Sequence, residues 1–307
     1  MAGVPSKTDI GWFEDADQLG TQQGLGAFDA EKLKRARAIV SAFEKRRGAG
    51  EFPQLDRQKI ADGLNWRLTS PNSFNQGDTF LCGIATFVRV WAFDNPDAYA
   101  QLAVDLFEKG EGNLTGFQKG AKTIRPSSAL KTCPPGKLAD GKEFNHADWI
   151  VLASIREAFN SVFDYTNNEG IFRIKAWNFP SDVENEFRAA GYSKVINKAD
   201  GFRLAGYNLL MEASELYERN WRVILLINSR LLSTKPENTI ATPVLNHSNH
   251  WIGLNSVINT VISGGKWGVV PFSVYSWDGL YNVPRWNKVV PLDLVLHSYF
   301  GFVAGHV

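Results

Sequence analysis

Two cysteines occur in this 307-residue chain, and Cys82 has neighbours suited to chemistry. It lies where a polar, Gly- and Asn-containing segment changes into a helical pattern, and Gly83 follows it. A thiol at a helix N-terminus lies close to unpaired N–H groups and to the positive end of the helix dipole, which favour the nucleophilic thiolate. Gln76 lies upstream and can bring its amide beside the sulfur to stabilise an oxyanion, with the backbone N–H of Cys82 as a second donor. This pattern predicts thiolate catalysis, with Gly83 keeping bulk away from the reacting carbonyl.

A thiolate mechanism also needs a base, and His250 is the candidate. It begins an apolar strand pattern, Trp251–Leu254, so we expect its ring at the edge of a cleft. A third group must orient the imidazole. The next predicted strand can pair antiparallel with the first and ends at Asp278, which makes Asp278 a candidate orienter. The order glutamine, cysteine, histidine, carboxylate is the order found in papain-like folds.

Competing interpretations exist for several of these side chains. An isolated cysteine is most often a small buried hydrophobe. Cys133 precedes two prolines in a loop and has no accompanying pattern, so we expect no functional role for it. His247 precedes His250 by three positions, a spacing that zinc sites use. No third ligand or helical Glu pattern accompanies the pair, so we expect no metal and no cofactor. His250 is preferred as the base because apolar strand residues follow it directly.

The elements that must position these groups follow from periodicity. Apolar spacing and capping residues predict helices over 29–47, 82–93, 95–110, 149–159, 181–191 and 208–219. Strand patterns occupy 223–227, 251–261, 269–277 and 298–307, whereas 111–145 is predicted as a long loop. Helices first and antiparallel strands later indicate an α+β fold.

The chain resembles papain-like cysteine proteases, in particular the bacterial toxin and effector branch associated with type VI secretion. The residues that carry the resemblance are Gln76-Gly77, Leu81-Cys82-Gly83, Asn95–Tyr99, Phe107–Gly110, Ala147–Trp149, Gly191-Tyr192, Asn249–Trp251 and Tyr275–Trp277. The similarity covers roughly residues 65–307. It implies a helical half that carries the nucleophile, followed by a C-terminal antiparallel β-sheet half.

By this resemblance Cys82 is the nucleophile, His250 the base and acid, and Gln76 the oxyanion donor. The third member departs from the plant enzymes, in which an Asn precedes Ser-Trp-Gly; Tyr275 has that place here and Asp278 follows the tryptophan. Three alternatives stay open: Asp278 orients the imidazole, a backbone carbonyl does so, or the site is a dyad.

The resemblance implies a hydrolase of peptide or isopeptide bonds that is delivered into a competitor or host cell. Its partners would be a protein substrate, a cognate immunity protein and a secretion apparatus or chaperone. Residues 1–64 lie outside the resemblance, and we interpret them as an N-terminal helical appendage to a protease domain at 65–307. A peptidoglycan amidase or endopeptidase, or a glutamine deamidase, would use the same Cys-His geometry. A non-catalytic binding module is the alternative from another class, although both Cys82 and His250 are retained.

Composition excludes several other classes. The formal net charge is +1, which offers no basic field for phosphates, so nucleic acid is not expected as a partner. The longest aliphatic run, Val223–Ile227, is far shorter than the roughly 20 residues that a membrane span needs. Two cysteines provide no disulfide framework and no multi-cysteine zinc module. The first residues lack an apolar signal segment, so we expect synthesis in the cytoplasm and export by another route.

Overall fold

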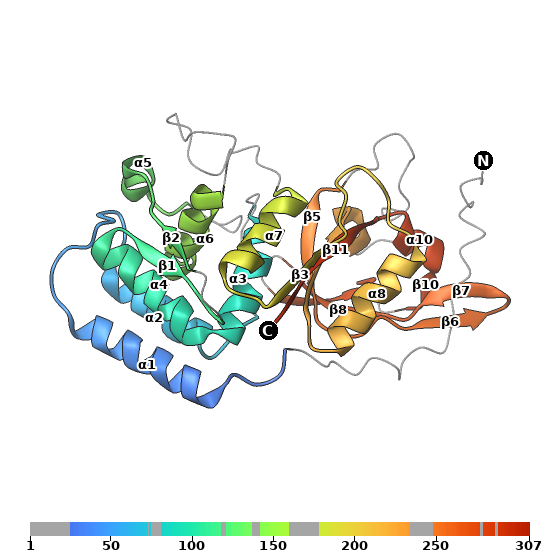
Figure 1. Ribbon diagram of the computed structural model, residues 1–307, viewed down its shortest axis with the longest axis horizontal. Coiled ribbons are helices and arrows are strands. Elements are labelled where there is room, and N and C mark those ends of the chain that lie inside the picture. Colours follow the sequence, from blue (N-terminus) through green and yellow to red (C-terminus); the bar gives the residue numbers. More distant parts are fainter. Residues whose placement is uncertain are drawn as a thin grey trace. The chain divides into compact units, whose positions relative to one another are not determined.

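A computed structural model describes residues 25–72, 74, 81–117, 121–136, 142–159, 178–233, 248–276, 279–285 and 288–307. The chain divides into two compact units. We call them the helical unit, Gly26–Val195 with Gly305–Val307, and the sheet unit, Ile196–Ser276 with Leu280–Ala304. The order of elements, helices and then antiparallel strands, confirms the predicted α+β class (Figure 1). None of the helices in the described ranges is long and apolar enough to cross a membrane.

The helical unit is built from seven helices and a short hairpin in its described part. These elements are α1 (Ala30–Lys45), α2 (Arg57–Arg67), α3 (Cys82–Asp94), α4 (Pro96–Lys109), β1 (Gly112–Leu114), β2 (Lys122–Ile124), α5 (Ser128–Thr132), α6 (His146–Phe159) and α7 (Pro180–Ala189). In β1 and β2, Gly112 pairs with Ile124 and Leu114 with Lys122. This hairpin and α5 lie within the segment predicted as a loop, and that prediction is wrong there.

Local sequence explains where these helices begin and end. Asp29 accepts a hydrogen bond from the backbone N–H of Lys32 at 2.8 Å and so caps α1, as predicted. Pro96 opens α4 and Gly110 ends it in the left-handed conformation, with φ of 71°. Asn95 stands at the N-cap of α4, but its side chain makes no capping bond and instead accepts one from Lys32 Nζ at 2.9 Å.

Helix α3 is the buried centre of the helical unit. Every residue from Gly83 to Phe93 is buried, including Arg89, which donates from Nε and Nη2 to Asn72 Oδ1 at 2.9 and 2.6 Å. Helices α4, α6 and α7 all contact α3. A helix that is apolar on every side is stable only when neighbours cover it, so these contacts fix where the first residue of α3 lies within the unit.

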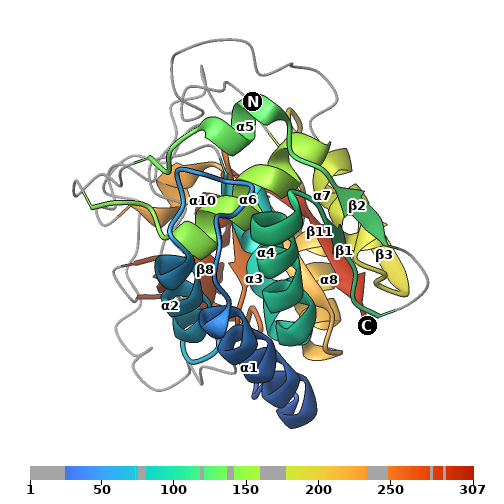
Figure 2. The same cartoon turned by 90° about the vertical axis from the view of Figure 1, so that its left-hand side faces the viewer.

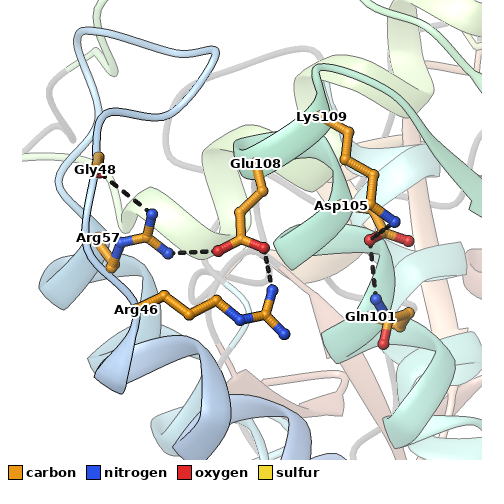
Figure 3. A network of polar contacts seen from close by, with 7 residues as sticks. All are labelled: Arg46, Gly48, Arg57, Gln101, Asp105, Glu108 and Lys109. Carbon is orange, nitrogen blue, oxygen red and sulfur yellow. Dashed lines mark hydrogen bonds and ion pairs between the residues drawn. The ribbon is translucent and has the colours of Figure 1, made fainter.

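Helices α1 and α2 belong to this same unit. Glu108 of α4 accepts from Arg57 at 2.7 Å and pairs with Arg46, while Arg57 also donates to the carbonyl of Gly48 at 3.3 Å (Figure 3). Both views show α1 and α4 side by side (Figures 1 and 2), and α2 contacts α1 and α6. Residue 64 lies inside α2, and α1 and α2 both pack within the helical unit, so the boundary between the compact units lies elsewhere along the chain.

The sheet unit contains most of a six-stranded sheet in the order β3-β11-β4-β5-β8-β9 and a smaller sheet in the order β10-β7-β6. The strands of the large sheet are β3 (Lys194–Asn197), β4 (Arg222–Ile227), β5 (His250–Leu254), β8 (Phe272–Ser276), β9 (Gly279–Val283) and β11 (Tyr299–His306). The small sheet contains β6 (Thr260–Ser263), β7 (Lys266–Val269) and β10 (Val290–Pro291). Helix α8 (Tyr207–Glu218) packs on β4, and the short helices η2 (Ser229–Leu232) and α10 (Leu292–Leu296) complete the unit.

Strand β5 pairs antiparallel with β4 on one side and with β8 on the other. His250 is the partner of Ile227 in the first pair, and Gly253 is the partner of Tyr275 in the second. The antiparallel pairing predicted for the strand of His250 is thus confirmed. The prediction that this strand continues to Val261 is wrong, because β5 ends at Leu254 and the next strand lies in the other sheet.

Candidate active site

Cys82 is the first residue of α3, at the loop-to-helix junction that the sequence predicts. The N-cap, Leu81, has no side-chain acceptor for the N–H groups of the first turn, and its carbonyl accepts from the N–H of Ala85 at 2.7 Å. The Cys82 side chain is partly exposed, in contrast to the fully buried positions that follow it. A partly exposed sulfur at the positive end of a buried helix is in a setting that suits a reactive thiolate.

The structure explains why a glycine follows the cysteine, which the sequence alone did not reveal. A Cβ at Gly83 would lie 2.5 Å from Asn178 Nδ2 and 2.9 Å from the Cβ and Cγ atoms of Asn178. Atoms that approach so closely cannot coexist, so glycine is required here because the Asn178 side chain packs directly on the backbone. This contact adds a requirement to the role we predicted for Gly83, that of leaving room for a substrate carbonyl.

His250 is the first residue of β5 and is only 5% exposed. Its Nε2 atom lies 2.7 Å from the hydroxyl oxygen of Ser276, the last residue of β8, which is itself buried. Extending the Gly253–Tyr275 register by one pair sets Ser276 on the face that His250 shares, because side chains two positions apart on a strand point the same way. The sheet register therefore brings these two side chains together.

Burial alone lowers the pKa of His250 from 6.5 to about 4. An imidazolium ion loses its hydration when it is enclosed, so the neutral ring is favoured at neutral pH. The neutral imidazole can act as a proton acceptor, and its Nε2 atom is bound to the Ser276 hydroxyl.

Ser276 is a candidate site residue that sequence reasoning missed. It stands one position after Tyr275, in the motif that was compared with the Asn-Ser-Trp-Gly segment of the plant enzymes. The sequence did contain a signal for this contact: Ser276 ends a predicted strand that was expected to pair with the strand of His250. Gln76 and Asp278, the predicted oxyanion donor and orienter, both lie outside the described residues.

The helical unit contains a group of buried polar residues, one of which, Asn178, packs on Gly83 at the start of α3. Arg156 of α6 donates from Nη1 to Asn178 Oδ1 at 2.6 Å, and both side chains are buried. Glu186 of α7 is fully buried, and burial, followed by the charge of Asp182, raises its pKa well above the usual value, while Arg156 acts in the opposite sense. The predicted site residues included none of these groups, because they come from positions distant in the sequence.

Cys133 provides a contrast to Cys82. It is the C-cap of the short helix α5, and its sulfur lies 3.7 Å from the carbonyl oxygen of Pro134. A helix C-terminus and a carbonyl acceptor both favour the protonated thiol over the thiolate. Both cysteines are partly exposed thiols, so access alone does not distinguish them.

The predicted site residues that the structure describes fall in different units: Cys82 in the helical unit and His250 in the sheet unit. Within the described ranges, no three His, Cys, Asp or Glu side chains form a group able to hold a metal ion. Comparisons of the chain with models of protein families and with curated protein sequences gave no match.

Proposed function

We propose that this chain is a papain-like cysteine protease in which Cys82 is the nucleophile and His250 the base. The observation that carries the proposal is the position of Cys82, partly exposed at the first residue of the buried helix α3. His250 supports it, because it begins an antiparallel strand and its Nε2 atom is hydrogen-bonded to Ser276. A helix-borne thiol and a strand-borne imidazole are the two parts that the papain-like mechanism needs.

In the proposed reaction, the imidazole of His250 takes the proton of the Cys82 thiol, and the sulfur attacks the carbonyl carbon of a peptide bond. The oxyanion accepts hydrogen bonds from the backbone N–H of Cys82 and from Gln76. Collapse of the tetrahedral intermediate breaks the C–N bond, and His250 returns its proton to the leaving amine. Water, deprotonated by His250, then hydrolyses the thioester and restores the thiol.

The buried histidine fits this cycle when a thiolate is its neighbour. Burial alone lowers the pKa of the ring to about 4, which would make it a weak base. A thiolate beside the ring stabilises the imidazolium and raises that pKa again. We therefore propose that the sulfur and the imidazole act as a pair whose members titrate together. Ser276 holds the ring through Nε2, and Asp278 is the proposed additional orienter.

The proposal includes delivery as an effector. On the resemblance, the chain would be exported into a competitor or host cell and inhibited in its producer by an immunity protein. The substrate would be a protein of the recipient cell. An amidase or deamidase that used the same cysteine and histidine would act on side-chain amides or cell-wall peptides, and it would create no new protein termini.

The test is to express the parent, Cys82→Ala and Cys133→Ala separately in recipient cells and to sequence new protein N-termini. We expect new termini and toxicity with the parent and with Cys133→Ala, and neither with Cys82→Ala. If Cys82→Ala stays as toxic as the parent, the nucleophile assignment is wrong. Toxicity that depends on Cys82 but produces no new termini would show that the protease assignment is wrong and would favour an amidase or deamidase.

A further inference from the structure

The Asn178 side chain touches the segment that carries the proposed nucleophile. It is 7% exposed, and its Nδ2 atom is the atom closest to the position that a Cβ of Gly83 would have, at 2.5 Å. Gly83 immediately follows Cys82 at the start of α3. An amide in such close contact with the backbone restricts how the first turn of the helix can shift.

Arg156 determines which way the Asn178 amide points. A guanidinium group donates hydrogen bonds and cannot accept them, so the atom 2.6 Å from Arg156 Nη1 must be the carbonyl oxygen of the amide. The nitrogen end, with its two N–H donors, is therefore the end directed at the start of α3. The Arg156–Asn178 contact fixes the assignment of oxygen and nitrogen, which the shape of the side chain alone does not.

Two carboxyl groups interact electrostatically with Arg156, those of Glu186 and Asp182. Glu186 is fully buried and, among the described residues, neither of its carboxyl oxygens accepts a hydrogen bond. Burial raises the pKa of Glu186 well above its usual value, so the neutral acid is the favoured form and does not cancel the guanidinium charge. Asp182 accepts a hydrogen bond from the backbone N–H of Phe179 at 3.0 Å. A cation that polarises the Asn178 amide strengthens its N–H groups as donors toward an anion.

We propose that Asn178, oriented by Arg156, is a positioning residue for Cys82: it fixes the Cys82–Gly83 turn and presents amide N–H groups that favour the thiolate. The inference rests on the proposed function in one respect, that Cys82 acts as a thiolate. It assigns a role to a buried arginine, a buried asparagine and a glycine on three different segments. The effect is on the reactivity of the sulfur, which is measurable without a substrate.

The test uses the full chain with Cys133→Ser, so that Cys82 is the only thiol present. The rate of alkylation by iodoacetamide is measured against pH for this parent and for Asn178→Asp. The aspartate has the same shape and still accepts from Arg156, but it replaces the N–H donors with an oxygen that carries negative charge. We expect the pH midpoint of alkylation to rise by about one unit, and the rate near neutral pH to fall about tenfold.

Asn145→Asp is the matched control. Asn145 also packs on a glycine, Gly63, and accepts through Oδ1 from the backbone N–H groups of Ala147 and Asp148 at the start of α6. The same charge change at this helix start should leave the Cys82 midpoint where it is in the parent. A midpoint for Asn178→Asp within about 0.3 unit of that for Asn145→Asp would overturn the proposal.

A second measurement does not depend on any variant of Asn178. The side-chain amide ¹⁵N resonance of Asn178 in the parent should shift with the same pH midpoint as Cys82 alkylation, and this titration should vanish in Cys82→Ala. An amide resonance indifferent to the thiol overturns the proposal, even if Asn178→Asp fails to fold. Absence of peptide-cleaving activity would refute the proposed function but not this inference, because both readouts follow the ionisation of the Cys82 thiol and neither needs a substrate.

Discussion

The burial of His250 predicts a pH dependence of stability that can be worked out in advance. Its pKa is about 4 in the folded protein and 6.5 in an unfolded chain. Between these values the unfolded state binds a proton that the folded state refuses, so stability falls as pH decreases. At pH 5 the unfolded histidine is almost fully protonated and the folded one is mostly neutral. The free energy of unfolding should therefore be about 2 kcal/mol lower at pH 5 than at pH 7 from this one group.

Other groups titrate in the same range, so the prediction concerns a difference between two proteins. The raised pKa values of Glu186 and Asp182 act with the opposite sign, because a raised carboxyl pKa contributes stability that is lost as pH increases. His250→Gln keeps a side chain able to bond with Ser276 and removes the titration. Urea unfolding of both proteins at the two pH values gives four free energies, and the carboxyl contributions cancel in their double difference.

We make this comparison in the Cys82→Ala background, where no thiolate can raise the pKa of the ring. There we expect the protein with His250 to lose about 2 kcal/mol more than the protein with His250→Gln between pH 7 and pH 5. The assay is urea unfolding followed by circular dichroism, with a titration of the His250 ring protons by NMR as a direct check. A double difference below about 0.5 kcal/mol, together with a ring that titrates near its ordinary value, would refute the argument from burial. A ring that titrates near its ordinary value in the parent but near 4 in Cys82→Ala would instead indicate pairing with the thiolate.

Three further predictions concern other parts of the chain. Near neutral pH, iodoacetamide should alkylate Cys82 at least about tenfold faster than Cys133, as read by peptide mass spectrometry, since a helix begins at one and ends at the other; equal slow rates would contradict this. Ser276→Ala should lower peptide-cleaving kcat about tenfold with KM unchanged, because the ring loses its hydroxyl partner. Ser273→Ala on the same strand is its control, and equal losses in both would indicate a packing effect. Asp148→Asn should reduce the free energy of unfolding in urea by about 3–5 kcal/mol, because it removes the negative charge that Asp148 places beside buried Arg67. Glu111→Gln, at the exposed pair with Arg125, should cost less than about 1 kcal/mol, and similar losses for the two variants would refute the role of burial.

Helices with clear start and stop residues could be predicted from the sequence. Asp29 before α1, Pro96 and Gly110 around α4, and the apolar run of α3 all mark elements that the structure contains. Helix α2 was missed because its apolar residues are few, although Asp56 caps it by accepting from the Lys59 N–H at 2.9 Å. The capping aspartate was the one indication of a helix start, but no long apolar stripe followed it to indicate the helix itself.

The extent of the strand after His250 could not be predicted, because the interruption depends on long-range hydrogen bonds. Asn255 N–H donates to the carbonyl of Ser273 at 2.9 Å, and the hydroxyl of Ser256 accepts from the N–H of Ser273 at 2.8 Å. The first bond continues the pairing of β5 with β8, whereas in the second the Ser256 hydroxyl takes the N–H that the next backbone bond would use. The pairing ends there, and Thr260–Ser263 pair in the small sheet instead. Alternating hydrophobicity continues through such a break, so periodicity alone joins the two strands into one.

The two proposed reactive groups show what sequence spacing can and cannot identify. Each is the first residue of an ordered element, so the change of pattern at Cys82 and at His250 was visible. The polar partner beside each comes from a distant segment: Asn178 packs on Gly83, and Ser276 contacts His250 across the sheet. No local pattern links position 83 to position 178, because helix packing brings them together. The proposed nucleophile and base are therefore the residues that a single sequence points to, whereas the residues proposed to set their ionisation and orientation emerge only from the fold.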